Sequence, residues 1–253
     1  MPRSTHLEYP GALYHVTSRG VQRCLIFRDD RDRQELLKLL SSALKSFDAR
    51  ALAYCLMGNH YHFVIQTRRA NLSTLMQRIN ATYGQAFNRR HQRSGHLFEG
   101  RFKAILVDRD NYLLKVCRYV DLNPVRAGLV ESAAQWRWSS HRAHTGAAPI
   151  PHWLATGDLL GALTGRVPAN EAEFEAARER YAEWVAEGRG SRLWSEALRD
   201  GEYLGDAAFV ERVNRSVALE RDGFGGSGSG LRLESRRDEE TCDQRSDAIR
   251  GES

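Results

Sequence analysis

The order of strand-like and helix-like segments in the first half of the chain restricts the fold more than any other feature of the sequence. β-Branched and aromatic residues indicate strands, and apolar residues recurring every three or four positions indicate helices. These signals predict, in chain order, a strand at 12–19, a helix at 29–47, strands at 49–57 and 60–67, a helix at 71–90, a strand at 102–107 and a helix at 110–121. The first six segments follow the ferredoxin-like βαββαβ order. We therefore expect an α+β fold in which the first and third strands lie side by side at the centre of the sheet.

The chain changes character after Pro124. All five tryptophans lie beyond this residue, and helical periodicity returns at 171–187 and 207–219. The sequence predicts three units: an α+β domain at 1–150, a smaller helical domain at 151–222 and a tail at 223–253. The tail starts with the linker-like stretch GFGGSGSG and continues with charged residues, a composition that predicts disorder.

The basic residues are unevenly distributed along a chain whose formal net charge is +5. Residues 68–103 contain eight Arg or Lys and a single acid, Glu99, whereas most acids lie after residue 170. A basic front half favours a polyanionic partner. The cysteines are scattered without a CxxC pair, and no segment approaches the ~20 apolar residues of a membrane span. We expect a cytoplasmic protein with no membrane partner.

The segment His60-Tyr61-His62 is the sharpest local motif. Residues i and i+2 of a strand point to the same face, so the two imidazoles lie side by side. Paired neutral imidazoles suit a divalent cation. In the expected topology, His15 on the first strand could lie near them. The alternative for an isolated HxH pair is two half-exposed histidines that bind only water.

Tyr119 and Asn123 are four residues apart at the end of the helix at 110–121, and an i, i+4 pair shares one helix face. An amide oxygen is an acceptable ligand for Mg²⁺ or Mn²⁺, and a tyrosine is a possible nucleophile. Spacing alone equally allows an ordinary aromatic residue followed by a routine Asn-Pro turn. Tyr83 is a rival nucleophile, but its helical spacing with Ile79 and Phe87 predicts a core position.

The stretch from residue 89 to 103 combines positive charge with aromatic rings. Single-stranded nucleic acids bind to such combinations because phosphates attract cations and unstacked bases stack on rings. The alternative is a solvated basic loop. The predicted DNA-binding residues are Arg89, Arg90, Arg93, Arg101 and Lys103.

Four segments, in this order along residues 7–144, resemble the HUH tyrosine transposases. The likeness is to the branch of REP-associated tyrosine transposases, which is related to the IS200-like transposases. The segments are GALYHVTSRG (11–20), AYCLMGNHYHFVIQT (53–67), FNRRHQRSGHLFEGRFKAILV (87–107) and YLLKVCRYVDLNPVRAGLV (112–130).

This resemblance implies that residues 1–150 form a ferredoxin-like catalytic core that cleaves and rejoins single-stranded DNA beside hairpin repeats. It places the nucleophile at Tyr119, which would form a 5′-phosphotyrosine intermediate. It places the ligands of Mg²⁺ or Mn²⁺ at His60, His62 and Asn123. It also implies a repetitive hairpin DNA as partner, a monomer or homodimer, and an additional DNA-binding role for the C-terminal helical domain.

Three other functions fit the same fold. A non-catalytic hairpin-binding protein or repressor is disfavoured because none of the four implied active-site residues is missing. An RNA-binding protein would carry Phe and Tyr on the central strands, where this chain has histidines. A hydrolase that uses water as the nucleophile would still cleave DNA after loss of Tyr119.

Overall fold

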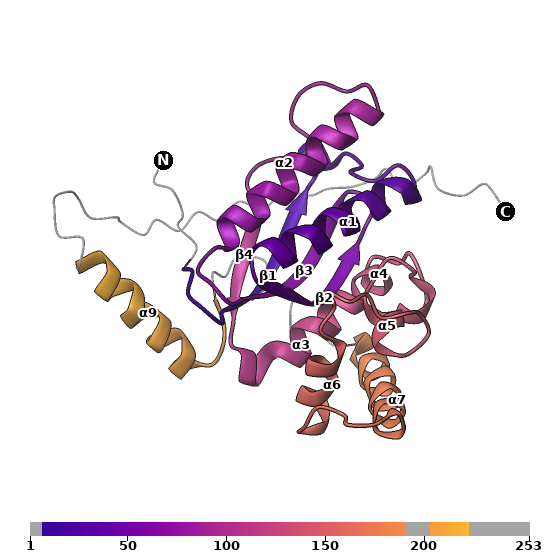
Figure 1. Cartoon of the computed structure of the whole chain (residues 1–253), viewed down its shortest axis with the longest axis vertical. Helices are drawn as coiled ribbons and strands as arrows, with labels where there is room; N and C mark the ends of the chain where they lie inside the picture. The colour runs from indigo at the N-terminus through magenta and orange to yellow at the C-terminus, as the bar shows by residue number, and fades with distance from the viewer. Residues whose placement is uncertain (1–6, 191–202, 223–253) are drawn as a thin grey trace.

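The computed structural model describes residues 7–190 and 203–222 (Figure 1). The first elements are β1 (Leu13–Arg19), η1 (Val21–Arg23), α1 (Asp30–Ser46), β2 (Ala49–Leu56), β3 (His60–Thr67), α2 (Leu72–Arg90), β4 (Lys103–Val107) and α3 (Arg109–Asp121). Apart from the short 3-10 helix η1, this is the order predicted from the sequence, with element ends within one residue of the prediction.

The strands form one sheet in the order β2-β3-β1-β4-β5. Strand β1 is antiparallel to both β3 and β4, which confirms that the first and third strands are central neighbours. Strand β5 (Tyr203–Leu204) pairs in parallel with β4 at the edge. It was not predicted, because two residues are too short to show strand alternation.

Each face of the sheet is covered by different helices. Helices α1 and α2 cover one face, and α3 crosses the other (Figure 1). The alternation of side chains along the strands produces this division. Tyr14 and Phe63 pack under α1 and α2, whereas Leu13 and Val64 pack against α3. Successive residues of each strand therefore point alternately toward α1 and α2 and toward α3.

Helices α1 and α2 form where the sequence predicts them. Asp29 is the N-cap of α1, because its carboxylate accepts a hydrogen bond from the Asp32 amide at 3.1 Å. The predicted apolar face of α2 is buried throughout: Leu72, Leu75, Met76, Ile79, Tyr83 and Phe87. Among the described residues, no helix combines the length and apolar character needed to cross a membrane.

The chain after α3 continues as α4 (Asn123–Arg126), η2 (Ala133–Gln135), α5 (His141–His144), α6 (Thr156–Thr164), α7 (Glu171–Glu187), η3 (Gly188–Gly190) and α9 (Ala207–Asp222). Helix α7 has the predicted bounds, and α9 starts as predicted but ends three residues later. Helices α4, α5 and α6 were not predicted, because short helices carry little periodic signal.

Helices α6 and α7 pack against the outer side of α3 (Figure 1). Leu159 and Leu160 of α6 and Tyr181 and Val185 of α7 belong to the same hydrophobic cluster as Leu13 of the sheet. Apolar packing is therefore continuous across the boundary predicted at residue 150. The division into domains stays a prediction, and the predicted tail at 223–253 lies outside the described residues.

A buried carboxylate joins the end of α3 to α7. Asp121 is completely buried and accepts hydrogen bonds from the Tyr181 hydroxyl at 2.8 Å and the Ser140 hydroxyl at 2.9 Å. Burial raises the pKa of Asp121 to about 7, although both hydrogen bonds favour its charged form. One turn away, the Arg118 guanidinium stacks 4.1 Å from the ring centre of Trp184. These contacts attach α7 to the helix that carries Tyr119.

Replacing Tyr181 by Phe removes one donor from this buried carboxylate. We expect the free energy of unfolding to fall by about 1–3 kcal/mol, because the cost of an unsatisfied buried acceptor is of that size. Urea unfolding followed by circular dichroism measures the change. Tyr9→Phe is the matched control and should change stability by less than about 0.5 kcal/mol, since Tyr9 lies at the surface. Equal stabilities of the two variants would contradict this role for Tyr181.

Candidate active site

A cleft of about 750 Å³ opens on the α3 side of the sheet. Strands β1, β3 and β4 form its floor, α3 forms one wall, and the loop before β4 forms another. The lining residues are His15, Thr17, Ser18, Arg19, His60, His62, Glu99, Gly100, Arg101, Lys103 and Tyr119. Three cations and one carboxylate give this cleft a positive charge.

The histidines share this cleft because of strand alternation and register. His60 and His62 point to the same face, with ring centres 5.0 Å apart. Opposite His62 in β1 is Thr17, so His15 lies diagonally from His62 on that face. The His15 Nε2 atom is 2.9 Å from His62 Nδ1. The predicted proximity of His15 to the histidine pair is confirmed.

Each histidine of the pair has one ring nitrogen bound to a neighbour. His60 Nδ1 is 2.7 Å from the Asn59 side-chain oxygen, and His62 Nδ1 is bound to His15. The side chain of Asn123 forms a further hydrogen bond with His60. The Nε2 atom of His62 is buried and has no hydrogen-bond partner among the described residues.

The three histidines are electrically neutral at pH 7. Burial lowers the pKa of His15 and that of His60 to about 4, and it lowers the pKa of His62 well below the ordinary value. The positive charge of Arg19 lowers the pKa of His60 and of His62 further. Neutral imidazole is the form that binds metal ions.

Tyr119 lies over the histidines. Its ring centre is 5.7 Å from that of His15 and 5.9 Å from that of His62, and both contacts are nearly perpendicular, at 81° and 85°. The Arg126 guanidinium carbon is 4.7 Å from the centre of the Tyr119 ring. Tyr119 is partly exposed and lines the cleft. The structure thus brings together the tyrosine, the histidine pair and, through His60, Asn123.

The donor atoms in the cleft fit a divalent metal ion. Within residues 7–190 and 203–222, no group of three or more His, Cys, Asp or Glu side chains could hold a metal. The candidate set is different, since it combines two neutral imidazoles of the cleft with the amide of Asn123, which contacts His60. The buried His62 Nε2 without a partner is the atom expected of a ligand. Open positions would remain for water or a phosphate oxygen.

The five predicted DNA-binding residues lie in four different surroundings. Arg101 and Lys103 are exposed at the cleft, and Arg89 is exposed on α2. Arg93 lies near Cys24, with its guanidinium carbon 5.9 Å from the Phe87 ring centre.

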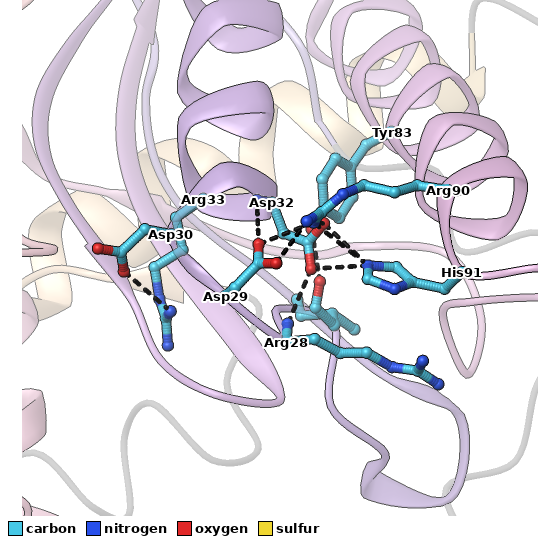
Figure 2. Close-up of polar contacts among 9 residues, drawn as sticks. Arg28, Asp29, Asp30, Asp32, Arg33, Tyr83, Arg90 and His91 are labelled. Carbon is cyan, nitrogen blue, oxygen red and sulfur yellow. Dashed lines mark hydrogen bonds and ion pairs between the residues drawn. The ribbon is translucent and has the colours of Figure 1, made fainter.

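Arg90 is not among the residues that line this cleft. Figure 2 shows its side chain pointing toward Asp29 and Asp32. Its guanidinium forms ion pairs with Asp29 and Asp32, next to His91, whose Nε2 is 2.9 Å from Asp32. Asp32 is nearly fully buried, so these contacts join the start of α1 to the end of α2.

The rival nucleophile Tyr83 lies on the opposite side of the sheet from the cleft. It is buried in the cluster beneath α1 and α2, which confirms its predicted core position. Its hydroxyl donates a hydrogen bond to the Ile26 carbonyl, and burial raises its pKa. The Tyr83 side chain is only 1% exposed, whereas Tyr119 is partly exposed.

Thr17, Arg19 and Arg126 belong to the site but were missed in the sequence. Thr17 and Arg19 share the face of His15 by strand alternation, so the pattern that selected His15 could have selected them. Arg126 follows Tyr119 by seven residues, across the break between α3 and α4. No helical spacing in the sequence predicts that contact.

Residues 9–123 match the model of a family described as "Transposase IS200 like". The match starts just before β1 and ends at Asn123, so it contains the whole βαββαβ core and the tyrosine helix. Over this segment, which is less than half of the chain, the protein is similar to the IS200-like transposases. No curated protein matches the chain.

Two solved structures are similar to this chain. A REP-associated tyrosine transposase bound to a REP hairpin aligns with 59% of this chain and 90% of its own, at 17% identity and a TM-score of 0.51. This likeness supports the fold. The tRNA(His) guanylyltransferase of Saccharomyces cerevisiae aligns with 83% of this chain and 96% of its own, at 10% identity. Its TM-score of 0.36 is too low to support any argument.

The buried histidines should make the protein sensitive to acid. His15, His60 and His141, each with a pKa near 4, gain protons in the unfolded chain below about pH 6.5 but not in the folded one. Stability is therefore present above pH 6.5 and is lost as the pH falls toward 4. A shift of about 2.5 units corresponds to on the order of 3 kcal/mol per group.

Thermal unfolding at pH 7.5, 6.0 and 5.0, without added metal, measures this loss. We expect the melting temperature to fall at each step. Asp121 acts in the opposite direction, because its raised pKa favours folding at low pH, but it is a single group. A constant melting temperature from pH 7.5 to 5.0 would show that the histidines are not buried in neutral form.

Proposed function

We propose that this protein is a metal-dependent tyrosine transposase that cleaves and rejoins single-stranded DNA next to hairpin repeats. The proposal depends on one observation: the Tyr119 ring contacts the rings of His15 and His62 in a positively charged cleft. The match of residues 9–123 to the family described as "Transposase IS200 like" supports the reaction class. The expected cytoplasmic location stays a prediction.

In the proposed reaction, the Tyr119 oxygen attacks a backbone phosphorus. A bond forms between this oxygen and phosphorus, and the bond from phosphorus to the 3′ oxygen breaks. The Tyr119 hydroxyl gives up its proton and the leaving oxygen takes one up, so the leaving group becomes a free 3′-OH, while the DNA remains attached as a 5′-phosphotyrosine. Attack by another 3′-OH reverses the step and joins the strands.

The surrounding residues have separate roles in this proposal. His60, His62 and Asn123 would hold Mg²⁺ or Mn²⁺, which supplies charge to polarise the scissile phosphate. Arg126 stacks on the Tyr119 ring and limits its rotation. Arg19 is near enough to the histidines to affect their pKa, so it is well placed to bind the same phosphate.

The proposed substrate is hairpin DNA with an adjoining single strand. The similar solved transposase is bound to a REP hairpin, which supports this class of partner. Arg101 and Lys103 supply the cations at the cleft. Tyr119 lies beside the histidines of its own chain, so we propose that one chain forms a complete site whether the protein is a monomer or a homodimer.

Tyr119→Phe should abolish a covalent protein–DNA adduct. The experiment incubates the protein with labelled single-stranded hairpin oligonucleotides and Mn²⁺, followed by denaturing electrophoresis. Wild-type protein and Tyr83→Phe should form the adduct, and EDTA should prevent it. Cleavage by Tyr119→Phe without an adduct would instead indicate a water-using hydrolase. Tight binding by the wild type without any cleavage would indicate a non-catalytic hairpin-binding protein.

Arg101→Gln and Lys103→Gln should weaken DNA binding through loss of phosphate contacts. For each variant, the slope of log affinity against log salt should decrease by about 1. Arg90→Gln is the matched control, because its charge is already paired with Asp29 and Asp32. It should lower the melting temperature and leave the salt slope unchanged. A smaller salt slope for Arg90→Gln alone would indicate that DNA binds at α2 and not at the cleft.

A further inference from the structure

His15 is the one histidine of the cleft to which the proposed mechanism gives no role. It lies in the central strand β1 and is 3% exposed. Its Nε2 atom is 2.9 Å from His62 Nδ1, and the two rings are parallel to within 3°. Burying a polar ring in the centre of a sheet is costly unless the ring makes a specific contact.

The hydrogen bond with His15 decides which atom of His62 can be a ligand. Because Nδ1 of His62 is occupied by this bond, only Nε2 has a free lone pair to offer. This Nε2 is buried and has no partner among the described residues. A neutral imidazole with a free Nε2 carries its proton on Nδ1. In that tautomer the N–H donates to His15 Nε2, and His15 carries its own proton on Nδ1, an atom that is also buried without a partner among the described residues.

His60 shows the same arrangement with a simpler partner. Its Nδ1 is 2.7 Å from the side-chain oxygen of Asn59. An amide oxygen can only accept, so Asn59 fixes the proton of His60 on Nδ1 and leaves the lone pair on Nε2, the nitrogen that remains for the contact with Asn123. Both members of the pair are thus held through Nδ1, one by an amide and the other by a histidine.

We propose that His15 is a positioning residue that accepts the Nδ1 proton of His62 and so presents the Nε2 atom of His62 to the metal. This inference rests on the proposed function, since it assumes a metal at the histidine pair. Loss of such a partner of a ligating histidine typically lowers metal affinity 10–100-fold. His15 itself does not bind the metal.

Direct titration with Mn²⁺, followed by electron paramagnetic resonance of the free ion, tests this role without any catalytic assay. His15→Leu should bind Mn²⁺ 10–100-fold more weakly than wild type. His15→Gln should remain within about 3-fold, because its side-chain oxygen can accept the same proton. His152→Leu, the same substitution at an exposed histidine outside the cleft, is the matched control and should bind like wild type. Melting temperatures identify any variant that has not folded.

The outcomes separate this inference from the proposed function. If wild type binds Mn²⁺ and His62→Ala does not, but His15→Leu binds like wild type, the role of His15 is wrong and the metal site stands. If wild type binds no Mn²⁺, both the metal-dependent function and the role of His15 are wrong.

Nitrogen-15 NMR of the histidine rings gives a second readout that needs no change at His15. In wild-type protein saturated with Mg²⁺, the proton of His62 should be on Nδ1. The His62→Ala spectrum identifies the signal. A proton on Nε2 of His62 would overturn the proposal even if every His15 variant failed to fold.

Discussion

The antiparallel pairing of β1 with β3 is the constraint on which the candidate site depends. This register places His15 diagonally opposite His62, at a distance that allows a hydrogen bond. Because side chains alternate, a shift of one residue would turn the histidines toward α1 and α2 and bring Tyr61 and Phe63 to the cleft. The apolar packing of each face opposes such a shift. The core and the site are therefore specified by the same pairing.

The tyrosine helix is positioned from both ends. At its start, the Asp108 side chain accepts a hydrogen bond from the amide of Asp110. At its end, Asp121 accepts hydrogen bonds from Ser140 and Tyr181. The Arg118 side chain packs so closely on Gly188 that a Cβ atom at this glycine would lie only 2.6 Å from it. Tyr119 lies between these end contacts, so the segment after residue 140 contributes to the placement of the proposed nucleophile without lining the cleft.

Local patterns predicted most of the fold and part of the site. Strand alternation was enough to place His60 and His62 on one face, and topology was enough to bring His15 near them. The long-range partners could not be predicted. Arg90 was grouped with the DNA-binding residues because nothing local shows that Asp29 and Asp32, about 60 residues earlier, neutralise it. The sequence likewise does not predict that α6 and α7 pack on α3, because apolar periodicity does not indicate which surface a helix covers.

The hydrophobic cluster shared by α3, α6 and α7 extends beyond the residues that match the family model. The family match ends at Asn123, yet apolar cover for the tyrosine helix extends to Val185. A fragment that stopped at the end of the match would leave the outer side of α3 in water, next to the carboxylate of Asp121 without its partner Tyr181. A fragment that ends with the match should therefore be less stable than one that extends through α7.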